Sequence, residues 1–189
     1  MAPTCFFVLA HVATAFIGGG LGTKPLATAL KFAAGDSVPL DGEFMVMADG
    51  PSPLAAKEVF EGKTVVVFGI PGALTPTCTE KQMPGYVEKA DEFKSKGVDT
   101  VACLSVNDPF VMAEMSKKQD PDGKITMLAD GAAAFVKAID IGVDTGNFGG
   151  VRCQRCSMLV KDGVATIVNL EGGTGFTEIS AAETLLGQL

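Results

Sequence analysis

Hydrophobic positions along the chain fall into short dense runs separated by longer segments in which they recur at helical spacing. The dense runs are rich in β-branched residues, as buried strands are, and predict strands at residues 42–47, 64–70, 99–106 and 124–129. The longer segments predict helices at residues 55–60, 83–97, 109–118, 132–139 and 180–189. Pro84 and Gly85 fall inside a helix that begins near Thr77, so a kink or a restart is expected there.

The last part of the chain departs from this alternation. Residues 142–150 are Gly-rich and predict a weakly structured connection. Two strands, 156–160 and 164–170, face each other across Lys161-Asp162-Gly163, which is a β-hairpin signal. Strands alternating with helices, followed by a hairpin and a helix, predict one α/β domain at residues 36–189, with a central mixed β-sheet flanked by helices.

The junction after the strand at Thr64–Ile70 contains the strongest chemical signal. Pro71-Gly72 ends the strand, and Thr77-Cys-Thr-Glu80 has the Thr-x-x-Glu form of a capping box, which predicts that a helix begins there. Cys78 then lies among backbone N–H groups without intrahelical partners, at the positive end of the helix dipole, and both favour a thiolate. The alternative is an inert buried cysteine. Because a buried strand, a turn and a helix cap directly precede or surround Cys78, the sequence favours a reactive cysteine.

The charge and the cysteines narrow the function classes. A net charge of -7 argues against binding to nucleic acid or to an anionic membrane through the overall field, so a small neutral or weakly charged substrate fits better. The cysteines are too few and too unevenly placed for a disulfide scaffold, which indicates a reducing or redox-buffered compartment. They are Cys5, Cys78, Cys103, Cys153 and Cys156.

Residues 1–35 differ from the remainder because they contain no Asp or Glu. Cys5–Ile17 is apolar but too short to span a bilayer, and it contains Ala13-Thr-Ala15, the A-x-A form of a signal-peptidase site. With the small, hydroxylated stretch that follows, it resembles the two-part presequences of algae with secondary plastids. We therefore expect an organelle, a plastid being favoured over a mitochondrion or the cytoplasm; the alternative is a poorly ordered tail. His11, the only histidine, lies here and is not expected to be catalytic.

Several separated motifs of the chain occur in the order found in one enzyme family. Pro71-Gly-Ala-Leu-Thr75-Pro-Thr-Cys78 resembles the Pro-x-x-x-Thr-x-x-Cys signature of the peroxiredoxins. The type-five (atypical, type II) branch is matched by residues 101–108, Leu128-Ala-Asp130, Arg155-x-Ser157-Met158 and Asp162-Gly163. The resemblance covers residues 36–189 and implies a thioredoxin-like fold. It further implies a homodimeric, cofactor-free peroxidase that reduces hydrogen peroxide and alkyl hydroperoxides to water and alcohols.

Carried over residue by residue, the resemblance implies the members of the site. Cys78 is the peroxidatic nucleophile, Thr75 positions its thiolate and the peroxide, Pro71 shields the site, and Arg155 is the active-site arginine. Peroxide reduction needs such groups, because a thiolate attacks one oxygen while negative charge develops on the other, and a permanent guanidinium charge stabilises both. The product is a sulfenic acid at Cys78, which a thiol must then reduce.

The source of that thiol is the next question. Relatives with an internal resolving cysteine carry it just after the last Gly-rich loop, where this chain has Glu178. The resemblance therefore implies one-cysteine turnover, with glutathione and glutaredoxin or thioredoxin as the external reductant. Cys103 matches a cysteine of plant-like members and is an alternative resolving thiol, but its apolar strand favours a place in the core. Gln82 and Leu74 depart from the histidine and phenylalanine common in relatives, so the hydrogen bonds and the apolar wall near Cys78 should differ.

Cys153 and Cys156 form a C-x-x-C unit around Arg155. No second Cys/His pair exists to complete a zinc site, so a metal is not expected. On a strand, Cys153 would share a face with Arg155 while Cys156 pointed the other way, which disfavours a bridge between them. Cys153 could then reach oxidised Cys78 or serve as a relay. A packing or surface role is the alternative.

Other function classes fit the sequence less well. A thioredoxin-like redox sensor or partner-binding module without significant turnover would not need Thr75, Cys78 and Arg155 together. A thiol-disulfide oxidoreductase would need a C-x-x-C unit at the helix start, where this chain has Thr75 before Cys78. The sequence therefore favours a peroxidase.

Overall fold

Each dense apolar run forms a strand in the computed structural model, which describes residues 31–189. The strands of the main sheet are β1 (Glu43–Met47), β2 (Pro51–Ala55), β3 (Thr64–Ile70), β4 (Thr100–Ser105), β5 (Ile125–Ala129), β8 (Cys156–Lys161) and β9 (Val164–Leu170). A separate pair consists of β6 (Gly142–Asp144) and β7 (Val151–Cys153). The α-helices are α1 (Ala56–Phe60), α2 (Met83–Ser95), α3 (Pro109–Gln119), α4 (Ala134–Ala138) and α5 (Ala182–Leu186).

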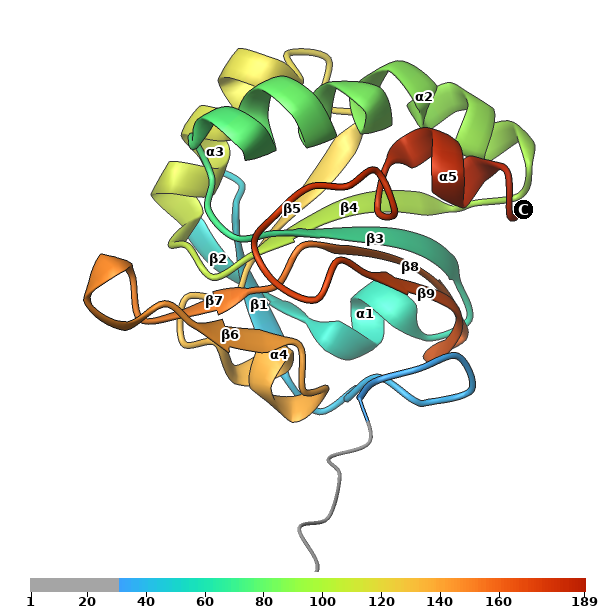
Figure 1. Ribbon diagram of the computed structural model, residues 1–189. Helices are drawn as coiled ribbons and strands as arrows, with labels where there is room; N and C mark the ends of the chain where they lie inside the picture. Colours follow the sequence, from blue (N-terminus) through green and yellow to red (C-terminus); the bar gives the residue numbers. More distant parts are fainter. Residues whose placement is uncertain (1–30) are drawn as a thin grey trace, which may run out of the picture. The chain divides into compact units, whose positions relative to one another are not determined.

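The main sheet is mixed, with the strand order β2-β1-β5-β4-β3-β8-β9. β3, β4 and β5 run parallel, whereas β8 pairs antiparallel with β3 and β1 pairs antiparallel with β5. In Figure 1, α2 and α5 lie on one side of the sheet and α1 and α4 on the other. The predicted α/β architecture, a central mixed sheet flanked by helices, is confirmed.

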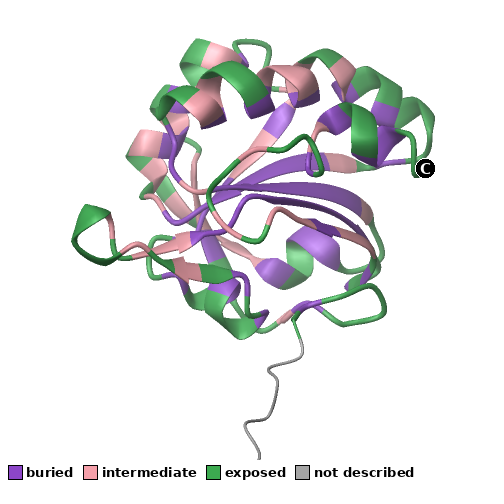
Figure 2. Cartoon of the chain, viewed as in Figure 1, coloured by how far each residue is buried: buried purple, intermediate pink, exposed green. Residues whose placement is uncertain are grey.

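The sheet separates two clusters of buried hydrophobic side chains. Val65 and Val67 of β3 face the cluster that includes α1 and α4, while Val66, Phe68 and Ile70 face the cluster that includes α2, α3 and α5. Figure 2 shows the central strands buried between these layers. Cys78 belongs to the α2 side, so the candidate nucleophile lies under this layer.

Two strand regions were not predicted from the sequence. β2 contains Pro51 and Pro53, which argue against a strand, but it lies at the edge of the sheet, where proline is tolerated. The prediction of a weakly structured connection at 142–150 is wrong. β6 and β7 pair antiparallel there, and a 3-10 turn at Gly146–Phe148 joins them.

The helix that carries Cys78 begins differently from its prediction. Pro76, the residue before it, already has helical dihedral angles, and no side chain caps the helix, so the predicted capping box is wrong. The segment Thr77–Gln82 is π-helical, with the Met83 N–H donating to the carbonyl of Cys78. Pro84 has no N–H to donate, and the α-helical pattern resumes with this proline in its first turn. The restart predicted at Pro84 is therefore a change from π- to α-helix.

The folded domain includes residues ahead of the predicted boundary at Asp36. Phe32 is buried in the core on the α1 side, and the Gly35 N–H donates to the Ala165 carbonyl at 2.8 Å. The presequence prediction otherwise falls on residues 1–30, which lie outside the described residues. Within residues 31–189, no helix is both long enough and apolar enough to cross a membrane.

Candidate active site

The turn after β3 holds the first half of the site. Leu74 adopts a φ of 63°, a left-handed conformation uncommon for leucine, which reverses the chain before Thr75. The Thr75 hydroxyl donates to the Gly72 carbonyl at 2.8 Å, so its oxygen lone pairs stay available to accept a hydrogen bond. Cys78, at the start of the following helix, is only 1% exposed. Its sulfur therefore lies at the base of a pocket.

The end of the neighbouring strand β4 braces this turn. The Asn107 side-chain oxygen accepts from the Ala73 N–H at 3.0 Å and from the Ser105 hydroxyl at 2.8 Å. The Ser105 hydroxyl also lies 3.1 Å from the Ile70 carbonyl. Because β3 and β4 are parallel neighbours, their carboxyl ends meet at one edge of the sheet. The sequence places Asn107 only within the family motif of residues 101–108, and its position directly after a buried strand was the available signal for a role at this edge of the sheet.

Arg155 supplies the second half of the site. It is 2% exposed, and one terminal nitrogen, Nη2, lies 3.4 Å from the Cys78 sulfur and donates to the Thr174 carbonyl at 3.0 Å. The other terminal nitrogen, Nη1, donates to Gln82 Oε1 at 2.6 Å. The guanidinium nitrogen Nε, next to the aliphatic stem, donates to the loop carbonyls of Thr174 and Gly175, and Cζ lies 5.7 Å from the centre of the Phe176 ring. The site therefore joins residues far apart in sequence.

The partners of Arg155 determine its electrostatic effect. All its hydrogen-bond acceptors among residues 31–189 are neutral oxygens except the Cys78 sulfur, which becomes an anion when ionised. A buried guanidinium without a carboxylate partner is costly, and a thiolate in contact with it compensates both charges. The arrangement therefore places a buried positive charge next to the Cys78 sulfur, where a negative charge that develops during a reaction would be stabilised.

A pocket of about 460 Å³ opens onto these groups. Its lining combines the polar site residues with apolar side chains and includes Pro71, Thr75, Cys78, Phe148, Arg152 and Arg155. The four site residues predicted from the sequence, Pro71, Thr75, Cys78 and Arg155, therefore all line one cavity. A small hydroperoxide fits such a pocket, because a few polar groups are combined with apolar walls in its lining.

A second layer of residues holds Arg155 in place. Gln82 is buried, and its amide donates to the Cys156 carbonyl at 3.4 Å and to the Ser180 hydroxyl at 3.3 Å while its oxygen binds Arg155. Ser180 in turn donates to the Glu171 carboxylate from its N–H at 3.0 Å and its hydroxyl at 2.9 Å. The Glu171 N–H donates to the Arg155 carbonyl at 3.0 Å. Gln82, at a position where relatives commonly have histidine, thus gives the Arg155 guanidinium a neutral acceptor. A role for Glu171 was not predicted from the sequence.

Replacing Glu171 with glutamine is expected to lower stability by about 1 kcal/mol near neutral pH, after allowance for solvent screening. Burial raises the pKa of the Glu171 carboxyl, but hydrogen bonds from Thr177 and Ser180 outweigh burial and hold this pKa below its ordinary value of 4.5. The carboxylate therefore contributes fully above that value, and its contribution is lost as pH falls through the lower folded-state pKa. Urea unfolding of both proteins at about pH 7 and about pH 3 should show the difference shrinking at the lower pH. A difference independent of pH contradicts this assignment.

The other cysteines lie apart from the pocket. Cys103 is fully buried on β4, beside Phe68 of β3 and on the same face as Cys78. Burial, followed by the proximity of Cys78, raises the pKa of Cys103, so this thiol stays protonated. Its sequence-based interpretation as core agrees with this position.

The predicted orientation of Cys153 is wrong. Its side chain belongs to the hydrophobic cluster on the α1 side of the sheet together with Cys156, whereas Cys78 belongs to the α2 side. The alternation rule failed because β7 ends at Cys153 and β8 begins at Cys156, with a bend between them. The sheet therefore separates Cys153 from Cys78 and gives the predicted relay no direct path. Within residues 31–189, no group of three or more His, Cys, Asp or Glu side chains could hold a metal ion.

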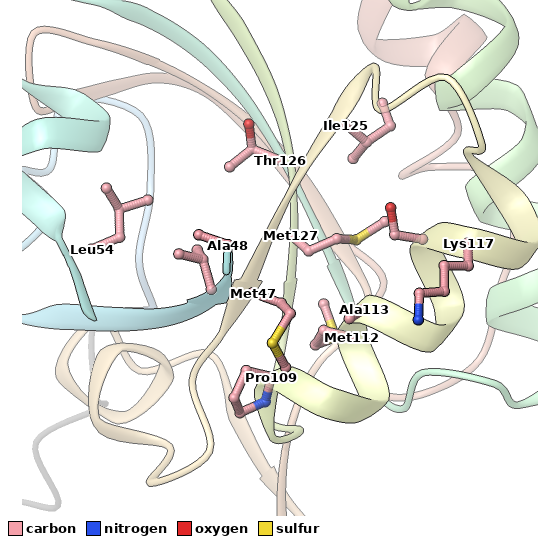
Figure 3. A pocket seen from close by; sticks show the side chains of 12 residues that line it. Met47, Ala48, Leu54, Pro109, Met112, Ala113, Lys117, Ile125, Thr126 and Met127 are labelled. Atoms are coloured by element: carbon pink, nitrogen blue, oxygen red, sulfur yellow. The ribbon is translucent and has the colours of Figure 1, made fainter. Parts of the chain in front are cut away.

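A second hollow, of about 500 Å³, lies between α3 and the β1–β5 side of the sheet (Figure 3). Met47, Met112 and Met127 bring their thioethers into it, and Pro109 and Leu54 add apolar wall. No cysteine lines it, so it lacks the nucleophile of the pocket around Cys78.

Comparisons with known proteins agree with this geometry. The family model described as Redoxin matches residues 33–186. Peroxiredoxin-2B of Arabidopsis thaliana is 41% identical over 160 residues, covering 83% of this chain and 98% of the relative. A chloroplastic peroxiredoxin-2E-2 of Oryza sativa subsp. japonica is 40% identical over 151 residues, covering 78% of this chain and 64% of the relative. The crystal structure of reduced Prx3 from Vibrio vulnificus in complex with H2O2 is 43% identical with a TM-score of 0.77, covering 82% of this chain and 98% of that chain.

The chain belongs to the Redoxin family, and within it to the peroxiredoxins. It is a thiol-dependent peroxidase, an oxidoreductase with a thioredoxin-like fold, and both predictions are confirmed. A hydroperoxide substrate and a thiol reductant follow from this class, and dimers are common in it. The chloroplastic relative fits an organelle location.

Proposed function

We propose that this peroxiredoxin reduces hydrogen peroxide and alkyl hydroperoxides to water and alcohols through a one-cysteine cycle at Cys78. The observation that supports this most directly is the 3.4 Å contact between the Cys78 sulfur and the buried, carboxylate-free guanidinium of Arg155. The order of the sequence motifs supports assignment to the type-five branch.

In the first step, the Cys78 thiolate attacks one oxygen of the hydroperoxide and the O–O bond breaks. The sulfur becomes a sulfenic acid, and the departing oxygen takes a proton and leaves as water or an alcohol. Arg155 stabilises the thiolate and the charge that develops on the departing oxygen. Thr75 accepts a hydrogen bond from the peroxide while it donates to Gly72, and Pro71 limits the access of water.

In the second step, an external thiol restores Cys78. Glu178 occupies the position at which relatives with an internal resolving cysteine carry that thiol, and Cys103 and Cys153 are both fully buried. Glutathione with glutaredoxin, or thioredoxin, therefore attacks the sulfenic acid in our proposal, and a second reducing thiol then releases Cys78.

Sulfenic acid trapping tests the first step. When the reduced full-length chain meets one equivalent of hydrogen peroxide in the presence of dimedone, we expect the adduct at Cys78 and not at Cys103, Cys153 or Cys156. Peptide mapping by mass spectrometry identifies the site. An adduct chiefly at another cysteine contradicts the assignment of the nucleophile.

Turnover with glutathione plus glutaredoxin, compared with turnover with thioredoxin, identifies the reductant. Sustained turnover without either would contradict external resolution.

The surface around the pocket supports a homodimer. Leu74, Phe110 and Phe148 are 41%, 63% and 90% exposed, and they lie on the turn before Cys78, at the start of α3 and at the pocket wall. Large apolar side chains that stay exposed are typical of an interaction surface. We assign them to a dimer contact next to the active site.

The apolar, acid-free composition of residues 1–35 supports location in a plastid.

A further inference from the structure

The C-x-x-C unit has no part in the proposed cycle, yet its two sulfur atoms lie together. A Cβ atom placed on Gly69 of β3 would lie 2.6 Å from the sulfur of Cys153 and 2.6 Å from the sulfur of Cys156. Two atoms at that distance from one point are at most twice that distance apart. The missing side chain of Gly69 thus provides the space that both buried thiols share.

The backbone between these thiols carries Arg155. The chain bends there, and the Cys153 thiol donates to the Gln154 carbonyl at 3.2 Å. Arg155 is anchored on both sides, because its N–H donates to the Gly173 carbonyl at 2.8 Å and its carbonyl accepts from Glu171. Any change in the span from Cys153 to Cys156 therefore acts on the backbone of the residue that contacts Cys78.

We propose that Cys153 and Cys156 form a reversible intramolecular disulfide under sustained oxidation, and that this disulfide displaces Arg155 from Cys78. The sulfurs of a disulfide are about 2 Å apart, so the loop through Gln154 and Arg155 must tighten when the bond forms. The first part stands on the geometry of the thiol pair alone. The second part, loss of peroxidase activity, rests on the proposed function of Arg155.

The oxidation balances with a hydroperoxide as the oxidant. One ionised thiol of the pair attacks an oxygen of the hydroperoxide, the O–O bond breaks, and a sulfenic acid and an alcohol or water form. The second thiol attacks that sulfur, the S–S bond forms, and hydroxide leaves with the thiol proton as water. Two thiols and one hydroperoxide thus give one disulfide, one alcohol and one water, and a dithiol such as dithiothreitol reverses the disulfide.

The environment of Cys153 and Cys156 determines under which conditions this thiol pair is oxidised. A hydrogen bond with Cys156, followed by burial, raises the pKa of Cys153, so this thiol stays protonated while the site is closed. Cys153 ends β7, and the β6–β7 pair has three residues in each strand and forms a two-stranded sheet that is not hydrogen-bonded to the main sheet. Such a short two-stranded pair opens more readily than the core. The disulfide should therefore follow prolonged exposure and not the first peroxide.

Disulfide formation is tested without peroxidase activity. In the full-length Cys78→Ser variant treated with the thiol oxidant diamide, we expect a Cys153–Cys156 bond that dithiothreitol reverses. Trypsin cuts after Arg155, so the disulfide joins two peptides that are separate in the reduced protein. The matched variant with both Cys78→Ser and Cys153→Ser should give no such joined pair. If both thiols remain fully alkylatable after diamide treatment of folded Cys78→Ser, the proposal is overturned, whatever the peroxidase activity.

The effect on activity is measured separately. After sustained turnover with excess hydroperoxide, the wild type should react with hydroperoxide at least about tenfold more slowly, and dithiothreitol should restore the rate. In Cys153→Ser the loss that dithiothreitol reverses should be smaller than in the wild type, because only the sulfenic acid of Cys78 is then left for this thiol to reduce, and a sulfinic acid at Cys78 is not reversed by it. Cys103→Ser keeps the pair and should behave as the wild type. Equal rates with the pair oxidised and reduced would overturn the second part.

Discussion

Replacing Cys78 with serine is expected to reduce the rate of hydroperoxide consumption on the order of a thousandfold or more, because a hydroxyl does not ionise at neutral pH. The variant should fold, since serine is close in size to cysteine and Arg155 keeps its contacts with Gln82 and Thr174. Stopped-flow consumption of hydrogen peroxide and of an alkyl hydroperoxide measures the loss.

Cys103→Ser is the matched control for this experiment. Cys103 is buried on the same face of the sheet as Cys78, but Arg155 does not contact it. This variant should retain fast peroxide consumption even if it is less stable. Equal rates in the wild type and Cys78→Ser would remove Cys78 from the mechanism.

Replacing Arg155 with lysine is expected to lower the rate constant with hydroperoxide by about a hundredfold or more, although the charge is kept. Lysine cannot extend one nitrogen to Gln82 and another to Thr174 and the Cys78 sulfur, as the planar guanidinium does. The loss should appear in the step that oxidises Cys78, which single-turnover kinetics isolates, and circular dichroism checks the fold.

Arg152→Lys provides the comparison for Arg155→Lys. Arg152 lines the same pocket, but it donates to the Gly149 and Val106 carbonyls and not to Cys78. Its replacement should slow the reaction much less. Similar losses in both variants would mean that general positive charge in the pocket matters, and not the contact with the sulfur.

The parts of the site that the sequence predicts are those encoded in adjacent residues. β3 has its predicted bounds because a run of β-branched residues is ended by Pro71. Thr75 and Cys78 belong to one continuous motif, and the family resemblance supplies Arg155. The strand and the Thr75–Cys78 motif are local signals, and tertiary packing did not override them; Arg155 is distant in sequence and is predicted only through the order of the family motifs.

The parts that were missed depend on contacts between distant residues. Gln82 binds Arg155 across 73 positions of sequence, and Glu171 acts through Ser180, so no spacing pattern reveals either role. The predicted cap at Thr77 failed because the helix had already begun at Pro76. The predicted separation of Cys153 from Cys156 failed because a bend, invisible to the alternation rule, divides their strands.

The edge strand β2 limits how copies of this chain can associate. Pro51 and Pro53 pair with Met47 and Met45 of β1, and the ladder forms although neither proline has an N–H to donate. The backbone nitrogens of these prolines, which lack a hydrogen, therefore face outward, away from β1. A further strand approaching this edge would find carbonyl acceptors but no donors at these two positions, which disfavours a continuous sheet across it. Even when crowded, molecules of this protein are shielded at this edge from the strand-to-strand stacking that leads to fibrils.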